Sequence, residues 1–212
     1  MKHHKKIILV TMVGIATMQS SFIQANDNDF VIVPSYITES SIDGDALSGA
    51  SGAIGVNMVA GDDNLQANAA AIAISPNGLA RTHISSHQAT AIGQATAPDS
   101  SIAGIRDNAF ANSTGILSIN QISGGSNVQA NGVSFAYGLE VTPVTDAALA
   151  QEVTGNTTDL SANGLDKSSL HIADIEATAF ENSRGIVQIN QTAGSGNATR
   201  NNFALRISAA AK

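Results

Sequence analysis

A pattern of glycine and asparagine recurs three times along this chain with no change in its spacing. In the last copy, GIVQINQTAGSGNATRN, the first Gly is followed by Asn after five residues, Gly after nine, Asn after twelve and Asn after sixteen. Such an internal repeat is typical of solenoids and stacked arrays, in which each unit packs on its neighbours. The matched positions are Gly52, Asn57, Gly61, Asn64 and Asn68; Gly115, Asn120, Gly124, Asn127 and Asn131; and Gly185, Asn190, Gly194, Asn197 and Asn201.

Each copy has the pattern of a strand, a tight turn and a second strand. Val187 and Ile189 alternate with Gln188 and Asn190, which is the period of a half-buried strand. A turn follows, GDDN, GGSN or GSGN, built from residues that tolerate positive φ. After the turn, apolar and polar residues alternate again, which is the pattern of a second strand. The sequence therefore predicts an all-β fold, a short β-solenoid or a stack of β-arcs joined by flexible linkers.

The asparagines have two interpretations. Stacked in register, their side-chain amides would donate and accept along the stack, as in the Asn ladders of cross-β structure. Asn57, Asn120 and Asn190 lie inside strands, where Asn is normally depleted, which favours a ladder. For Asn64, Asn127 and Asn197, a simple preference for turns explains the pattern equally well. The residues predicted to carry assembly are these asparagines with Asn68, Asn131, Asn201, Gln121 and Gln191, and Ile119, Val187 and Ile189 would form the dry side.

The N-terminus has the pattern of a secretion signal. Lys2, Lys5 and Lys6 lie in a basic segment, and 7–18 is an apolar run that is short for a membrane span. Ala25 offers a small residue for cleavage before the polar run NDND. We expect residues 1–25 to be a cleaved signal peptide, with an uncleaved anchor helix as the alternative.

Composition narrows the classes of function. The chain holds 10 Lys and Arg against 17 Asp and Glu, so loss of the three signal lysines leaves 7 against 17 and a net charge of −10. Such an acidic chain is a poor partner for nucleic acid or an anionic membrane surface. Cysteine is absent, so the chain forms no disulfide. Aromatic residues make up only 4%, too few for a thick core but enough for a stack in which each layer buries a few side chains.

The repeats divide the chain into segments. The second and third copies carry an additional leading strand, SSIAGI or SSLHIADI, and the first copy is a reduced version. The predicted segments are the signal at 1–25, a leader at 26–47, a first repeat at 48–75, a linker at 76–99, a second repeat unit at 100–138, a linker at 139–167, a third unit at 168–208 and a tail at 209–212.

Two stretches resemble a known family. GVNMVAGDDNLQANAAAIA, from Gly55 to Ala73, resembles the repeat of the Fap functional amyloids of Pseudomonas and related bacteria. The Gln191, Gly194, Gly196 and Asn197 spacing is similar to the curlin pattern, in which Gln precedes a Gly-x-Gly-Asn turn. The resemblance implies a secreted, surface-associated protein that polymerises into biofilm fibres or assists their assembly. It also implies other fibre subunits and an outer-membrane export machinery as partners.

One feature departs from that family. Its main fibre subunits carry a Cys-x-x-Cys near the C-terminus, whereas this chain has no cysteine. The resemblance therefore implies a minor, nucleating or accessory member.

No catalytic or cofactor site is predicted. His83 and His87 are four residues apart but have no evident third ligand for a metal. Asp43, Asp45 and the Asp62-Asp63 pair lie in oxygen-rich turns without the full ligand set that calcium needs. The chain lacks the Gly-x-Ser-x-Gly and phosphate-loop patterns. An exported enzyme is therefore the least favoured of the functions considered.

The sequence thus predicts a component of an amyloid-like surface fibre that assembles by in-register strand addition. The alternative is a monomeric β-solenoid adhesin that binds a protein or a carbohydrate. Arg184, Arg200 and Arg206 gather in the last repeat, whereas acidic residues dominate upstream. These arginines either help unlike units to stack head to tail or act as gatekeepers that slow aggregation.

Overall fold

The computed structural model describes residues 11–13, 36–86, 88–89, 98–141, 153–154 and 169–208. The described chain is all-β, as predicted. No helix within these ranges is long and apolar enough to cross a membrane. The strands are β1 (Thr11–Val13), β2 (Ile37–Ile42), β3 (Ser51–Ala60), β4 (Leu65–Ala80), β5 (Gln88–Ala89), β6 (Ser100–Ile105), β7 (Thr114–Ser123), β8 (Val128–Val141), β9 (Val153–Thr154), β10 (Leu170–Ile175), β11 (Arg184–Ala193) and β12 (Ala198–Ser208).

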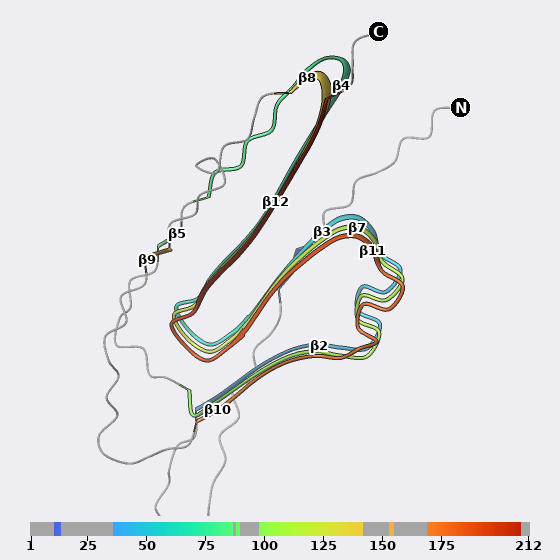
Figure 1. Ribbon diagram of the computed structural model, residues 1–212. Helices are drawn as coiled ribbons and strands as arrows, with labels where there is room; N and C mark the ends of the chain where they lie inside the picture. The colour runs from blue at the N-terminus through green and yellow to red at the C-terminus, as the bar shows by residue number, and fades with distance from the viewer. Residues whose placement is uncertain are drawn as a thin grey trace, which may run out of the picture.

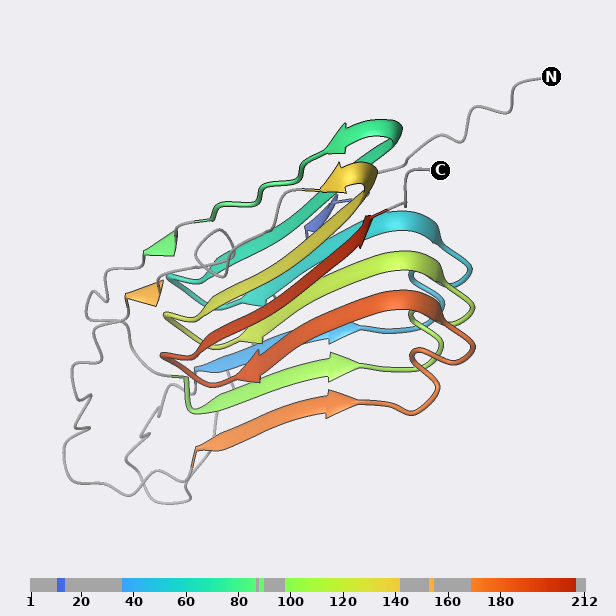
Figure 2. The ribbon, with the colours of Figure 1, turned by 45° about the horizontal axis from the view of Figure 1, so that its top comes forward.

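Nine of these strands form three stacked units of the same shape. Unit one comprises β2, β3 and β4, unit two β6, β7 and β8, and unit three β10, β11 and β12. Viewed along the stack, the units superpose as one winding path, and the turned view separates them into layers with unit two in the middle (Figures 1 and 2). The stacked parallel strands form the β-solenoid-like arrangement that the repeat predicts.

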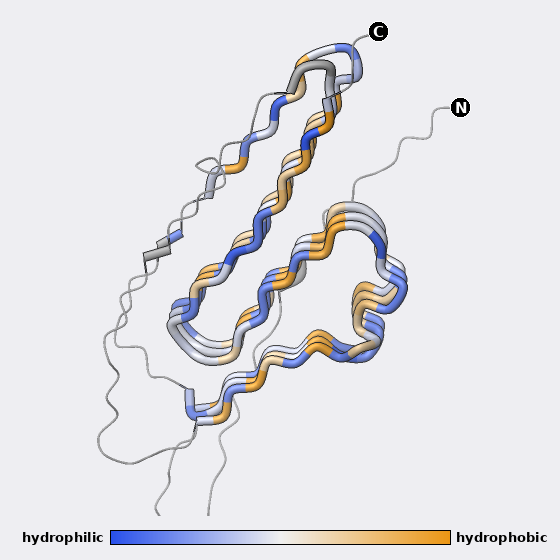
Figure 3. Tube along the Cα trace, in the orientation of Figure 1, coloured by the Kyte–Doolittle hydropathy of each residue, from blue (hydrophilic) through white to orange (hydrophobic). Residues whose placement is uncertain are grey.

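The strands pair in parallel and in register. Asn57 of β3 pairs with Asn120 of β7, which pairs with Asn190 of β11. We call three residues that share one register position a column. Like residues follow each other along most columns, so bands of equal hydropathy run across the three units (Figure 3). Each unit alone is a thin layer, and the columns supply the contacts that make a core.

The middle strand of each unit lies between the other two, and its side chains alternate between them. Ile119 packs with Ile105 of β6 in one apolar cluster. Asn120, the next residue, points the other way, since its amide bonds to Asn68 of β4. The sequence prediction that the apolar residue and the asparagine of this alternation face opposite sides of the strand therefore agrees with these contacts.

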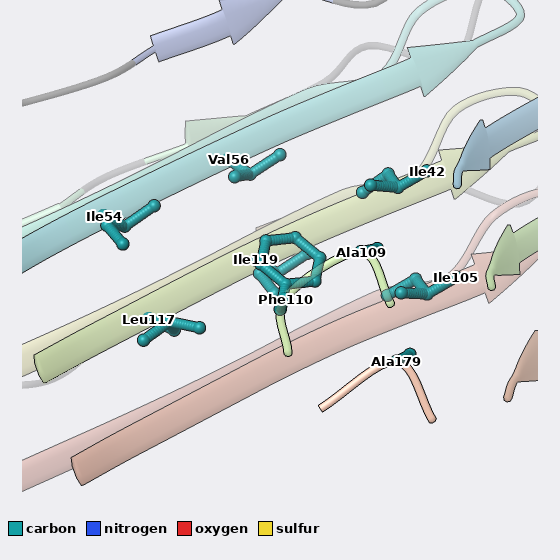
Figure 4. Close-up of a cluster of buried hydrophobic side chains, with 9 residues drawn as sticks. All are labelled: Ile42, Ile54, Val56, Ile105, Ala109, Phe110, Leu117, Ile119 and Ala179. Atoms are coloured by element: carbon teal, nitrogen blue, oxygen red, sulfur yellow. The ribbon is translucent and has the colours of Figure 1, made fainter. Parts of the chain in front are cut away.

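The main apolar cluster lies where the chain bends between the first and second strand of each unit (Figure 4). Phe110 is fully buried there. Its ring stacks on that of Phe180, with centroids 5.0 Å apart and an interplanar angle of 2°. Leu47 of unit one packs against the same cluster. The remaining buried members are Ile42, Ile54, Val56, Ile105, Ala109, Leu117, Ile119 and Ala179.

Unit one is longer than the sequence analysis expects. The segment assigned to a leader, 26–47, contains β2, and Ile37–Ile42 pairs in register with Ser100–Ile105. The first repeat is thus not a reduced version. Two of the buried positions of β2 are Thr38 and Ser40, so the strand lacks the apolar alternation that marks β6. The segments assigned to linkers also begin within strands, because β4 ends at Ala80 and β8 at Val141.

Two short pairings lie outside the three units. β5 pairs with β9 between the segments assigned to linkers. β1 lies within the predicted signal segment and pairs with Gly55–Asn57 of β3. The rest of residues 1–35, most of 139–167 and the tail at 209–212 lie outside the described ranges.

Candidate assembly site

Two columns of asparagine interlock between the sheet of β3, β7 and β11 and the sheet of β4, β8 and β12. The Asn120 Nδ2 donates to Asn57 Oδ1 at 3.0 Å and to Asn68 Oδ1 at 3.0 Å. The Asn190 Nδ2 repeats these bonds one layer on, to Asn120 Oδ1 at 3.0 Å and Asn131 Oδ1 at 3.1 Å. Asn201 closes the network with bonds to Asn131 and Asn190. The amides predicted at these positions thus form a continuous hydrogen-bonded ladder within one chain.

The turn asparagines form a second ladder, so the two interpretations of these residues hold together. The Asn127 Nδ2 donates to Asn64 Oδ1 at 3.0 Å, and the Asn197 Nδ2 to Asn127 Oδ1 at 2.9 Å. The same oxygens accept the backbone N–H of the next unit, at 2.9 Å for both Asn127 and Asn197. These residues shape their turns and also tie each turn to its neighbour.

The two predicted glutamines bond across the other side of the middle strand. The Gln121 Nε2 donates to Ser40 O at 2.9 Å and Gly104 O at 2.8 Å. The Gln191 Nε2 donates to Gln121 Oε1 at 3.0 Å. Met58 occupies this column in unit one and has no amide, so the glutamine ladder spans two units only.

The sequence analysis missed one buried glutamine column. Gln66 and Gln129 pair in register, and the Gln66 Nε2 donates to Gln129 Oε1 at 3.4 Å. Gln129 is fully buried and also donates to Thr192 Oγ1 at 2.7 Å. A signal exists, since both glutamines stand fourteen residues after the first Gly of their repeat. Thr199 takes the third position and interrupts the pattern.

The six predicted turn glycines all have positive φ, between 109° and 136°. Space explains the four that face another unit of this chain. A Cβ on Gly115 would overlap the carbonyl oxygen of Gly52, and one on Gly185 that of Gly115. A Cβ on Gly61 would overlap Gly124 O, and one on Gly124 would overlap Gly194 O. These close approaches of backbone to backbone exclude any side chain at those positions.

Burial makes the ladders energetically important. Asn120, Asn127 and Gln121 are fully buried in unit two. A buried amide without partners costs about 1–3 kcal/mol, whereas a satisfied one contributes modestly. The ladders therefore favour the in-register alignment, because a slip of one residue would place amides against aliphatic side chains.

Both ends of the stack carry open strand edges. Among the described residues, no strand pairs with the outer edge of β10, β11 or β12. Every residue of β10 is exposed, and Val187, Leu205 and Ile207 of the neighbouring strands are 39–42% exposed. At the other end, β2 and β4 have one partner each, and β3 is covered only along three residues by β1. Open edges of this kind are templates for strand addition.

Other candidate residues do not assemble into a site. Within the described ranges, no three His, Cys, Asp or Glu side chains gather as metal ligands would. His87, the expected partner of His83, lies outside those ranges. The Asp62 carboxylate accepts a hydrogen bond from the Tyr36 hydroxyl at 3.3 Å. Partial burial and the charge of Asp62 raise the pKa of the Tyr36 phenol above its usual value.

Comparison with known proteins now identifies the family. The family model described as "Functional amyloid protein FapB/FapC family" matches residues 16–208. The chain belongs to the FapB/FapC family of functional amyloid proteins. It is 32% identical over 147 residues to the functional amyloid subunit FapC of Pseudomonas aeruginosa, a match that covers 66% of this chain and 42% of that protein. The chain thus spans less than half of the length of this curated relative. No solved structure matches the chain.

Proposed function

We propose that this protein is a subunit of an extracellular functional amyloid fibre and that it assembles by strand addition at the open edges of its three-unit stack. The observation that carries the proposal is the parallel in-register stack, whose amide ladders reach β11 and β12, and no described strand pairs with the outer edge of either. A copy that adds its strands in register extends every backbone and side-chain ladder at once. The asparagine, glutamine and glycine columns set the register of that addition.

The subunit acts at the cell surface after export, with self-association and other fibre subunits as its binding partners. The family to which the chain belongs and the relative named as an amyloid subunit support this location. With no cysteine in its sequence and three units among the described residues, the chain is suited to a minor, nucleating or accessory role in the fibre.

Assembly kinetics test the proposal. The purified chain, with its predicted signal removed, is followed by thioflavin T fluorescence, and the product is examined by fibre diffraction. We expect a rise in fluorescence and reflections near 4.7 Å and 10 Å, the spacings of strands and sheets. The Asn120→Ala and Asn190→Ala variants should assemble more slowly than the wild type.

The same experiment separates the fibre from the alternative adhesin. An adhesin would stay monomeric and β-folded for days, with or without seeds cut from wild-type fibres. That outcome would reject the fibre function and leave a soluble solenoid whose ligand must be sought among carbohydrates and proteins.

A further inference from the structure

We propose that the edge of unit three of one copy docks on the edge of unit one of a second copy, so that every column continues in register from chain to chain. This inference rests on the proposed fibre function and adds the polarity of the contact and the residues that enforce it. We call the open edges of β2, β3 and β4 the head and those of β10, β11 and β12 the tail.

The amide ladders have a direction. Between asparagine side chains the later unit donates to the earlier one: the Asn120 Nδ2 to Asn57 Oδ1, then the Asn190 Nδ2 to Asn120 Oδ1, both at 3.0 Å. The columns of Asn131 and Asn127 run the same way. The Gln66–Gln129 bond runs the opposite way. By the asparagine pattern, the Asn57 amide group of a second copy at the tail would donate to the Asn190 oxygen, as Asn190 donates to Asn120 within the chain. Head on tail continues the ladders, whereas head on head sets donors against donors.

The first glycine column lacks a neighbouring carbonyl oxygen at the head. Gly52 has a φ of 119°, close to the 129° of Gly115 and the 117° of Gly185. A Cβ on either later glycine would overlap the carbonyl oxygen of the unit before it, whereas one on Gly52 meets nothing within 4 Å. A second copy whose unit three lies above the head would place its own Gly185 oxygen in that space.

The second glycine column, Gly61, Gly124 and Gly194, lacks a neighbouring carbonyl oxygen at the tail. Side chains on Gly61 and Gly124 would overlap the carbonyl oxygen of the unit that follows. Gly194 ends the column, and the nearest atoms to a Cβ there belong to the His171 ring, 3.6 Å away. The next copy's Gly61 oxygen would complete this column. A methyl group on Gly52 or Gly194 would thus meet no atom closer than 3.6 Å in one chain but would overlap a carbonyl oxygen at a junction between chains. Positive φ strains a side chain at both positions, so each variant needs a check of its fold.

Hydrogen bonds between turn carboxylates and backbone N–H groups also favour a second copy of the chain, head on tail. The Gly44 N–H donates to Asp107 Oδ2 of the following unit at 2.9 Å, and the Asp107 N–H donates to Glu176 Oε2 at 2.8 Å. The next N–H in this column is that of Ala177, at the tail. Asp43 holds the register position of Glu176 in unit one, since Ile42, Ile105 and Ile175 share a column. The head of a second copy would therefore bring its Asp43 carboxylate to the Ala177 N–H at the tail.

Charge and shape also favour head on tail. Unit one, 36–80, has five acidic residues and no Lys or Arg, whereas unit three, 169–208, has three of each sign. Two heads would repel each other, and a tail meets a head without that cost. Between β11 and β12 the tail has a groove of about 680 Å³, lined on its two sides by Gln188 and Phe203. In unit one, Gly55 holds the register position of Gln188, and Ala70 holds that of Phe203. Both residues are small, so β3 and β4 of a second copy can approach the groove closely.

Three variants test the head-to-tail polarity of the contact. Each is made from the full chain and expressed in an exporting host, which processes it. Gly52→Ala blocks the head, and Gly194→Ala blocks the tail. Gly44→Ala is the control for a methyl group on a turn glycine with nothing within 4 Å, at a φ of 64°, where the backbone strain is smaller than at the 119° of Gly52 or the 109° of Gly194. Its column already carries a side chain, since Asp107 occupies the equivalent place with a φ of 55°. Circular dichroism checks that each monomer is β-folded, and sedimentation velocity measures association.

Each blocked variant alone should stay monomeric at concentrations at which the wild type and Gly44→Ala form fibres. A mixture of the two blocked variants should form a heterodimer and stop, because only one free head and one free tail remain. Dimers of Gly194→Ala alone would overturn the inference in favour of head-to-head contact, with edge assembly intact. If both blocked variants form fibres as fast as the control, edge addition itself fails, and the proposed function fails with it.

Discussion

Asn120 is the side chain on which most of the amide network depends. Its amide group donates to Asn57, Asn68 and the Ala67 carbonyl, and its oxygen accepts from Asn131 and Asn190. The side chain is fully buried, so none of these partners can turn to water instead. A residue of this kind sets register more than it adds net stability, because the satisfied bonds replace bonds to water.

Asn120→Ala should lower the free energy of unfolding by on the order of 3 kcal/mol, since it leaves several buried polar atoms without partners. Asn77→Ala is the matched control, because Asn77 is exposed on β4. It should change stability by less than about 0.5 kcal/mol. Urea unfolding of the monomer measures both, and equal effects of the two substitutions would show that the ladder contributes nothing specific.

Asn120→Asp should make stability depend on pH. The three acceptors that face the Asn120 amide group would face a carboxylate oxygen instead, which raises the pKa of the new carboxyl above its unfolded value of about 3.9. The folded state then binds the proton more tightly, so stability is highest below about pH 3.9 and is lost as pH rises through the folded pKa. Unfolding at pH 3 and pH 7, each relative to the wild type, measures the difference. A pH-independent deficit would contradict this reasoning.

At the residue scale, the spacing of the repeat was enough to predict the ladders but not their full membership. Asn57, Asn120 and Asn190 could be found because a polar residue recurred where strands normally exclude it. Gln66 and Gln129 escaped because Thr199 breaks their column. Positive φ was predictable at the glycines, whereas the contact of one glycine with the oxygen of another depends on the distance between units and is visible only in three dimensions.

Among the elements, the bend before each middle strand holds the densest apolar contacts. Its column reads Leu47, Phe110 and Phe180, with the central ring fully buried and stacked on the outer one. The column tolerates both a branched aliphatic and an aromatic side chain. Volume at this position therefore matters more than ring stacking.

Phe110→Ala should lower the free energy of unfolding by about 4 kcal/mol, the usual cost of removing a buried ring and leaving a cavity. Phe110→Leu, which copies unit one, should lose less than about 2 kcal/mol, because most of the buried volume is kept. Thermal unfolding of the two variants gives the comparison. If the Leu variant lost as much as the Ala variant, the stacked rings themselves would hold the bend.

The elements also show where sequence reasoning stops. β6 and β10 were predicted from the apolar alternation of SSIAGI and SSLHIADI. β2 was not, because its buried side chains include the hydroxyls of Thr38 and Ser40. Thr38 takes part in polar contacts: the Ser123 hydroxyl donates to Thr38 O at 2.7 Å, and the Thr38 hydroxyl donates to Ser101 Oγ at 3.1 Å. A strand whose inward side chains are hydroxyls has no hydrophobic period to detect.

On the scale of the whole molecule, the two ends of the stack differ in one respect that bears on assembly. The tail has no described strand on it, whereas β1 pairs with Gly55–Asn57 at the head. Val13 of β1 pairs in register with Asn57, so β1 occupies the strand position next to the central asparagine column. The predicted signal segment therefore covers part of the surface on which a second copy would dock.

Removal of residues 1–25 should accordingly speed assembly by freeing the head. The chain of 26–212 and the full chain are compared at equal concentration by thioflavin T fluorescence. We expect a shorter lag and faster elongation for the shorter chain.

A third sample separates this effect from general solubility. It is the full chain with Met12→Pro, which removes the β1 backbone N–H at the residue paired with Val56 and should release the strand. If the proline variant behaves like the shorter chain, the cover on the head controls assembly. If it assembles as slowly as the full chain while the shorter chain is fast, the effect belongs to the apolar run as a whole, and the β1 pairing has no role in it.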